Sequence, residues 1–369
     1  MSQLLQASTQ WARRPADERF TSLIDMRNAA TAKREASRSQ TVSSRSFQVM
    51  PNPNDERVGL LIAHDPKTGA GMSIATHWSF GQLATLAGAP AGYLRKLPAP
   101  MVADAINYGM RFLREPEDVG MLTAANGNNA RTLAAVTGPR YGRIWDSDIL
   151  SNLTSKFGDG LDGDFRVPGE FGIQKEVTKS NTTLFASDRD MFVFLADEKN
   201  RVEVANRRDG QTGSLARGFF VWNSEVGAQS MGAAFFLFDY ACSNRIVWGA
   251  QQFKEIRLRH TSAAPDRWIE QIAPVLEEYA ESAAAPIEAT IRAAQDRRIG
   301  EDLDSFLAGR FTKSQIVSIK RAHETEEGRP IETLWDAVTG VTAYAKTIAW
   351  QDERVAVERT GGLLLDLAA

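Results

Sequence analysis

The chain has 369 residues, of which 43% are hydrophobic and 24% are charged. It is therefore long enough for more than one packed unit and has the composition of a globular protein. Its net charge is −3 and its only cysteine is Cys242. These values exclude a disulfide framework and a uniformly basic nucleic-acid-binding protein. The most apolar run, MGAAFFLFDYAC, is interrupted by Asp239 and is shorter than the ~20 residues of a membrane helix. The first residues show no secretion signal, so we expect a cytoplasmic protein with no membrane partner.

The charges are unevenly distributed along the chain. Residues 1–46 carry 8 basic and 4 acidic side chains, whereas residues 263–369 carry 12 basic and 19 acidic ones. A local basic surface on the first two-thirds of the chain is therefore compatible with the negative total.

The first 120 residues predict a helix within residues 18–37 and three short strands. The runs TVSSRSFQVMP and RVGLLIAHD are expected to pair across the turn NPNDE, and a third strand follows KTGAG. Helices are expected from residue 79 to Gly88, from Pro90 to residue 97 and from residue 101 to residue 112.

The segment QLATLAGAPAGYLRKLP, residues 82–98, has the spacing of a helix-turn-helix corner. A recognition helix needs polar side chains at its N-terminal end to read bases. Here that end consists of Pro90, Ala91 and Gly92. We therefore predict a packed helical corner, in which Arg95 and Lys96 could touch only phosphate.

Residues 121–262 are dominated by period-two apolar runs typical of strands, interrupted by a helix from Asp146 to Phe157. After residue 262 the apolar residues recur at helical spacing, with Pro274 and Pro286 dividing the helices. The predicted fold class is α+β: an antiparallel β-sheet core flanked by an N-terminal α/β segment and a C-terminal helical region. The predicted domains are residues 1–120, 121–262 and 263–369.

No motif assigns a reaction. There is no GxxxxGK sequence, and one cysteine with four scattered histidines does not provide a zinc site, so we expect no cofactor and no metal. Cys242 and His260 could form a nucleophile pair, but their apolar surroundings favour packing roles. Two polar clusters, Asn223-Ser224-Glu225 and Cys242-Ser243-Asn244, have no partner that the sequence identifies, so catalysis is left open and a non-enzyme is favoured.

The arginines provide a better candidate. In FKEIRLRHT, alternation places Arg257 and Arg259 opposite Ile256 and Leu258. Arginine and aromatic side chains together are what single-strand binding requires. The candidate nucleic-acid-binding residues are Arg140, Tyr141, Arg143, Arg207, Arg208, Arg257 and Arg259, with Tyr141 as the base-stacking platform. The alternative is a solvated sheet face whose arginines pair with Asp188, Asp190, Glu198 and Glu203.

Several motifs resemble one family. RPADERFTSL, FGQLATLAGAPAGYLRKLP, RYGRIWD, FVWNSEVG, CSN and RHT occur in an order similar to that of phage- and plasmid-like proteins sharing domain of unknown function 932. The resemblance runs from about Trp11 to ERTGGLLL near the C-terminus. It implies a setting on mobile genetic elements and transfers no activity.

Three functions remain open. The first is a single-stranded-DNA-binding protein for strand annealing or recombination, able to form homo-oligomers. The second is a module that binds a host protein and acts against host defence, for which the acidic C-terminal third is suited. The third is an enzyme of unrecognised class.

Overall fold

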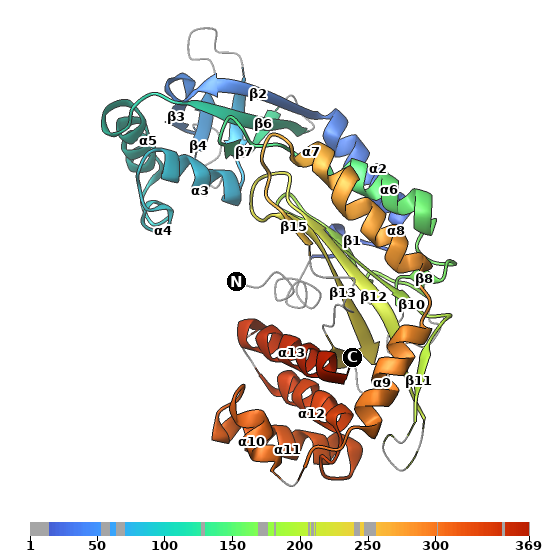
Figure 1. The fold of residues 1–369 in the computed structure, drawn as a ribbon. Coiled ribbons are helices and arrows are strands. Elements are labelled where there is room, and N and C mark those ends of the chain that lie inside the picture. The colour runs from blue at the N-terminus through green and yellow to red at the C-terminus, as the bar shows by residue number, and fades with distance from the viewer. Residues whose placement is uncertain are drawn as a thin grey trace.

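Two β-sheets organise the chain in a computed structural model (Figure 1). The structure describes residues 15–368 apart from 53–59, 64–70, 127–129, 169–175, 181, 206, 208–209, 211, 240–243, 247–255, 301 and 349–350. The fold is α+β, as the sequence predicts. The small unit, residues 37–137, contains the small sheet and its helices, and the large unit contains the large sheet and the helices that pack on it.

The large sheet has the strand order β1-β9-β10-β12-β13-β14, and all its pairings are antiparallel. Its strands are β1 (Arg19–Phe20), β8 (Phe165–Arg166), β9 (Leu184–Ala186), β10 (Met191–Asp197), β11 (Val202–Val204), β12 (Gly213–Asn223), β13 (Met231–Asp239), β14 (Asn244–Ile246) and β15 (Ile256–Leu258). The central meander of β10, β12 and β13 matches the apolar runs of the sequence.

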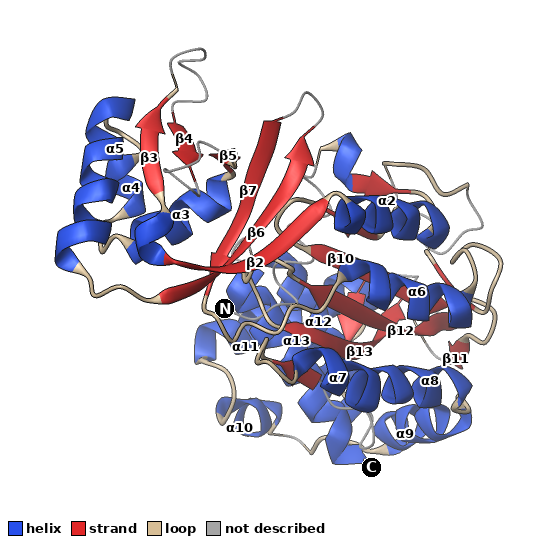
Figure 2. Ribbon diagram, turned by 90° about the horizontal axis from the view of Figure 1, so that it is seen from above, coloured by secondary structure: helices blue, strands red, loops and turns tan. Residues whose placement is uncertain are grey.

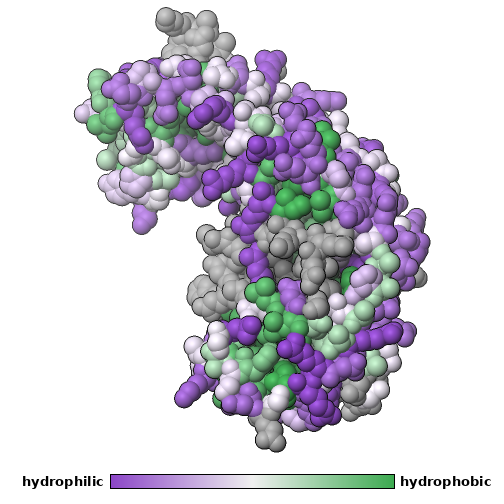
Figure 3. All heavy atoms as spheres, in the orientation of Figure 1, coloured by the Kyte–Doolittle hydropathy of each residue, from purple (hydrophilic) through white to green (hydrophobic). Residues whose placement is uncertain are grey.

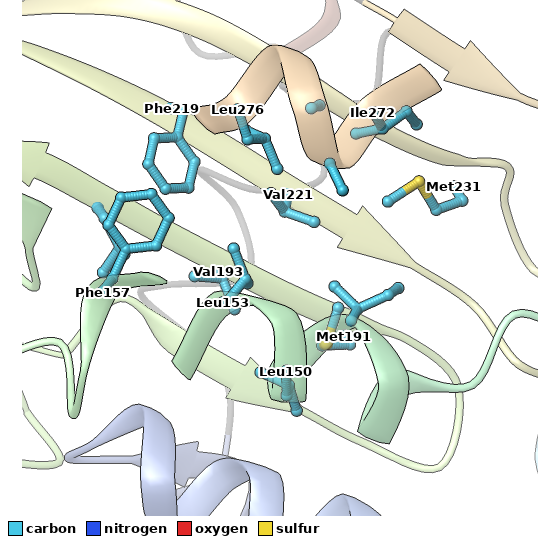
Figure 4. Close-up of a cluster of buried hydrophobic side chains, with 14 of the residues drawn as sticks. Leu150, Leu153, Phe157, Met191, Val193, Phe219, Val221, Met231, Ile272 and Leu276 are labelled. Atoms are coloured by element: carbon cyan, nitrogen blue, oxygen red, sulfur yellow. The ribbon is translucent and has the colours of Figure 1, made fainter. Parts of the chain in front are cut away.

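Both faces of this sheet are buried, which explains why its strands are almost continuously apolar. On one face Val193, Phe219 and Val221 pack against helices (Figure 4). These helices are α2 (Leu23–Glu35), α6 (Asp146–Phe157), α7 (Ala264–Arg267) with the π-helical segment Trp268–Ile272, and α8 (Ala273–Glu281). On the other face Phe194 and Phe220 belong to a second buried aromatic cluster.

The small sheet has the order β2-β6-β7-β5-β4-β3 (Figure 2). Its strands are β2 (Ser37–Ser43), β3 (Gln48–Pro51), β4 (Leu60–Ala63), β5 (Met72–Ala75), β6 (Asp118–Asn126) and β7 (Ala130–Thr137). The pair β5–β7 is parallel and the others are antiparallel. The antiparallel sheet predicted within residues 121–262 is confirmed from β8 to β15, whereas β6 and β7 belong to the small sheet.

The segment from residue 77 to residue 113 forms a helical corner against the small sheet. It comprises α3 (His77–Leu86), α4 (Ala91–Leu94), α5 (Ala99–Tyr108) and the π-helical segment Gly109–Leu113. Gly88 lies between α3 and α4 with φ 71°, a left-handed conformation that favours glycine. The cap of α3 is Thr76, whose hydroxyl accepts from the Ser79 amide. Helix α3 therefore begins two residues before the predicted start at residue 79.

The C-terminal helices form a third core at the far end of the large sheet, where Val202, Leu215 and Leu237 meet them. They are α9 (Ala285–Asp296), α10 (Leu303–Ala308), α11 (Lys313–Glu327), α12 (Leu334–Thr347) and α13 (Gln351–Leu365). Thr312 and Gln315 form a capping box at the start of α11. Short 3₁₀ turns lie at Ala16–Glu18, Ser44–Ser46 and Asp366–Ala368. In the described part of the chain, no helix is long and apolar enough to cross a membrane.

The helical corner makes one specific demand on the sequence. A Cβ added at Gly109 would overlap the Ala87 carbonyl group, because α5 crosses the end of α3 at that point. We expect Gly109→Ala to lower the free energy of unfolding by about 1–3 kcal/mol, as overpacking does. Gly92→Ala is the matched control, since no atom lies within 4 Å of its added Cβ. Urea denaturation measures both, and equal stability of the two variants would contradict the expectation.

Candidate nucleic-acid interface

The turn between β12 and β13, residues 223–228, connects the large sheet to several distant segments. The Ser224 hydroxyl donates to the Arg189 carbonyl (2.7 Å), and the Tyr141 hydroxyl donates to the Ser224 carbonyl (2.7 Å). The Asn223 amide donates to the Ile144 carbonyl (2.8 Å). The polar cluster Asn223-Ser224-Glu225, for which the sequence identified no partner, is therefore buried and connects these segments by hydrogen bonds.

The same turn holds helix α3 of the small unit. The Val226 carbonyl accepts both the Trp78 indole N–H (3.0 Å) and the Gln82 Nε2 (2.8 Å). Gln82 Oε1 in turn accepts from the Val136 amide of β7 (2.9 Å). One glutamine thus ties α3 to both sheets.

A buried charge network lies behind the turn. Lys33 Nζ is 3.0 Å from Glu225 Oε2, and Glu225 Oε1 accepts from the Asp146 amide (2.9 Å). Asp146 Oδ1 accepts from Asn223 (2.7 Å). Burial and the nearby Glu225 carboxylate raise the pKa of Asp146 to about 8. Burial alone would lower the pKa of Lys33, but Glu225 and Asp146 outweigh it and raise that pKa.

Residues 138–145 form a loop that packs against the end of β15. The Gly142 amide donates to the His260 carbonyl (3.1 Å), and His260 Nδ1 lies 3.0 Å from the Gly142 carbonyl oxygen. A Cβ at Gly142 would overlap the Thr261 carbonyl. The Tyr141 ring stacks on the His260 ring with centroids 4.8 Å apart. This approach explains the glycine in RYGRIW and brings two segments of the predicted site together.

Arg143 is the most unusual side chain of this loop. Its guanidinium carbon lies 5.3 Å from the Tyr141 ring centroid and 5.8 Å from that of Trp145. Nε and NH1 are buried, and neither has a hydrogen-bond partner among the described residues. Burial lowers the pKa of Arg143. Arg143 is therefore a cation that contacts two aromatic rings and has N–H donors without acceptors.

The structure brings together five of the seven predicted residues. Arg140, Tyr141 and Arg143 lie on the loop, and Arg257 and Arg259 are exposed on and just after β15. We call Arg140, Arg143, Arg257 and Arg259 the junction arginines. No ion pair with another described residue is formed by Arg140, Arg143 or Arg259, so for these three the expected pairing with Asp188, Asp190, Glu198 or Glu203 does not occur.

Arg207 lies elsewhere. It is buried and forms an ion pair with Glu327 of α11 (NH2 to Oε1, 2.5 Å), so it is a structural residue of the C-terminal helices. Arg208 lies outside the described residues, as do Cys242 and Ser243. Tyr141 has one ring face against His260 and its hydroxyl bonded to Ser224, which leaves it little freedom to stack on a base.

A second set of arginines lines a groove next to the loop of residues 138–145. The groove has a volume of about 630 Å³ and lies between α3 and the small sheet. Arg95, Arg114 and Arg189 line it, and we call them the groove arginines. Their guanidinium groups contact only backbone carbonyls and aromatic rings, and none forms an ion pair with a described residue. Hydrophilic side chains predominate where the small unit meets the large one (Figure 3).

Sequence reasoning noticed Arg95 as a phosphate contact but missed Arg114 and Arg189. The three come from α4, from the end of the helical corner and from the β9–β10 turn, so no linear spacing connects them. Among the described residues, no group of three or more His, Cys, Asp or Glu side chains could hold a metal ion.

The raised pKa of Asp146 predicts a pH dependence of stability. An unfolded aspartate has a pKa of about 3.9, so between about pH 4 and 8 the folded protein binds a proton that the unfolded chain does not. The contribution of Asp146 to the free energy of unfolding must therefore fall as pH rises through this window. We expect Asp146→Asn to flatten the decline between pH 5 and 8 in urea denaturation. Asp148→Asn, at an exposed position on the same helix, should keep the wild-type slope; identical slopes in all three proteins would refute the assignment.

Comparisons with known proteins place the chain in a family. A family model described as domain of unknown function (DUF932) matches residues 172–360, which include β9 to β15 and most of the C-terminal helices. No curated protein and no solved structure matches the chain. The matched residues make up more than half of the sequence, and the chain therefore belongs to the family of proteins with domain of unknown function 932.

Proposed function

We propose that this protein binds single-stranded DNA through its phosphate backbone at the junction arginines. The observation that carries the proposal is the hydrogen bond between Gly142 and His260, which holds the loop that carries Arg140 and Arg143 against the segment that carries Arg257 and Arg259, more than 100 residues away in the chain. Arginine donates two parallel hydrogen bonds to a phosphate, so a group of neighbouring arginines on a surface suits a polyanion.

Arg143 gives the strongest physical reason. A buried donor without an acceptor costs roughly 1–3 kcal/mol, and more when it is charged. A phosphate oxygen at this guanidinium would supply the missing acceptor and balance the charge at once. The free protein therefore holds an unfavourable arrangement that an anionic ligand would relieve.

Aromatic rings accompany these arginines, as in single-strand binders. Tyr141 and Trp145 flank Arg143, and Trp78 packs against the same apolar cluster as Trp145. In this arrangement Tyr141 positions Arg143, and we assign it no base-stacking role. The helices α10 to α12 lie at the other end of the curved molecule from the small unit (Figure 1), so much of the acidic C-terminal third lies away from the junction.

The direct test is fluorescence anisotropy with a labelled single strand of ~30 nucleotides at several salt concentrations. Four phosphate contacts predict a log–log salt slope of roughly −3, and Arg257→Ala with Arg259→Ala should reduce its size by about 1.4. Arg292→Ala with Arg310→Ala, two exposed arginines of the C-terminal helical region, is the matched control and should leave the slope unchanged. Absence of binding at micromolar protein would reject DNA binding and favour the host-protein alternative.

Arg143→Ala separates a binding role from a structural one. Because Nε and NH1 of this guanidinium are buried without hydrogen-bond partners, and only ring contacts offset that cost, its removal should leave the free energy of unfolding unchanged or raise it. The same change should weaken DNA binding by about tenfold or more, since a charge-assisted hydrogen bond contributes about 1.5–3 kcal/mol. Denaturation and anisotropy on one preparation check both effects. A marked loss of stability would show that Arg143 is structural.

A further inference from the structure

The groove between α3 and the small sheet is lined by both charged and apolar residues. Arg95, Arg114 and Arg189 contribute three positive charges, and Glu117 is the one carboxylate among its lining residues that the structure describes. The same groove also has apolar surface, which is provided by Leu86, Val119, Val136 and the ring of Trp78. A ligand that fits both walls must carry an anionic group and a flat or apolar body.

We propose that this groove binds the phosphate monoester of a nucleoside 5′-phosphate, either as a free nucleotide or as the phosphorylated end of a DNA strand. The strand-end source rests on the proposed DNA binding, whereas the free-nucleotide source does not. The phosphate contacts the groove arginines, and the base lies against the apolar wall.

Charge selects a monoester. Three guanidinium groups against one carboxylate leave a surplus of two positive charges, counting His77 as neutral. A phosphate monoester carries about −1.5 to −2 at pH 7, whereas an internal phosphodiester of a strand carries about −1. The terminal phosphate therefore matches the surplus more closely than an internal one does.

The groove arginines are already held in place. Arg95 NH2 donates to the His77 carbonyl (2.9 Å), and its guanidinium faces the Phe80 ring (5.1 Å). The Arg114 side chain donates to the Thr85 carbonyl (3.3 Å). These contacts use few of the five N–H donors of each guanidinium, so several donors remain for a phosphate without loss of side-chain order.

Arg189 completes the site from the large unit. Its guanidinium carbon lies 4.8 Å from the Trp78 ring centroid, and its carbonyl is fixed by Ser224. The volume of about 630 Å³ falls within the range of ~300–1,000 Å³ that is usual for small-molecule pockets. The groove is therefore large enough for one nucleotide and too small for a folded partner.

Isothermal titration calorimetry with deoxyadenosine monophosphate tests the groove itself. We expect saturable one-to-one binding by the full-length protein, with deoxyadenosine binding at least tenfold more weakly because it lacks the phosphate. Arg95→Ala with Arg114→Ala should weaken binding at least about tenfold. Arg292→Ala with Arg310→Ala, two exposed arginines outside the groove, should not change it.

The variant Glu117→Gln distinguishes an effect on nucleotide binding from a loss of folded structure. It removes the one carboxylate among the described lining residues and should tighten nucleotide binding about fivefold, an effect that loss of structure cannot produce. Equal affinity for deoxyadenosine and its monophosphate, no binding of either, or weaker binding after Glu117→Gln would overturn the proposal.

Strands with 5′-phosphate and 5′-hydroxyl ends distinguish the two sources. Tighter binding of the phosphorylated strand, lost in Arg95→Ala with Arg114→Ala, identifies the strand end. Nucleotide binding with no strand binding supports the groove as a free-nucleotide site and rejects the proposed DNA function. Strand binding that ignores the end group, with no nucleotide binding, leaves the DNA function standing and overturns the groove site.

Discussion

The hydrogen bonds of the turn between β12 and β13 fix the relative positions of the segments that surround it. Its donors and acceptors bond to α3, to the loop before α6 and to the β9–β10 turn. A buried polar group that loses its partner costs about 1–3 kcal/mol, so moving any one of these segments would leave several such groups unpaired at once. The turn thereby holds Arg189, the loop that carries Arg140 and Arg143, and helix α3 beside the groove.

Much of the fold is encoded in local sequence signals. The apolar runs of β10, β12 and β13, the prolines at the starts of α8 and α9 and the capping box at Thr312 all act within a few residues. What local signals do not contain is the partner of a strand. The pattern of β7 predicts a strand, but its pairing with β6 and, in parallel, with β5 is decided by residues far away in the chain.

The candidate site also depends on contacts between residues that are far apart in the sequence. Alternation correctly placed Arg257 and Arg259 on the exposed side of β15, since side-chain direction is a local property. Arg207 looked equally solvated in sequence, yet its partner Glu327 lies 120 residues away and buries it. Arg114 and Arg189 have no helical or strand periodicity to mark them, because they converge only when the two sheets are joined. Counting charge by segment showed that a local basic surface was compatible with the negative total, but it could not show which arginines meet.

The position of the small unit within the chain has a consequence for synthesis. Residues 37–137 are inserted between α2 and α6, two helices that pack side by side on the large sheet (Figure 1). As the ribosome releases the chain from its N-terminus, the small unit can be completed while the apolar face of α2, with Leu23 and Met26, still has nothing to cover it. At about 5–20 residues per second, the strands that complete this core, the last of which ends at Leu258, follow roughly 6–24 s later. During that interval a growing chain carries a finished unit and an uncovered helix, which is the state in which chaperones would meet this protein.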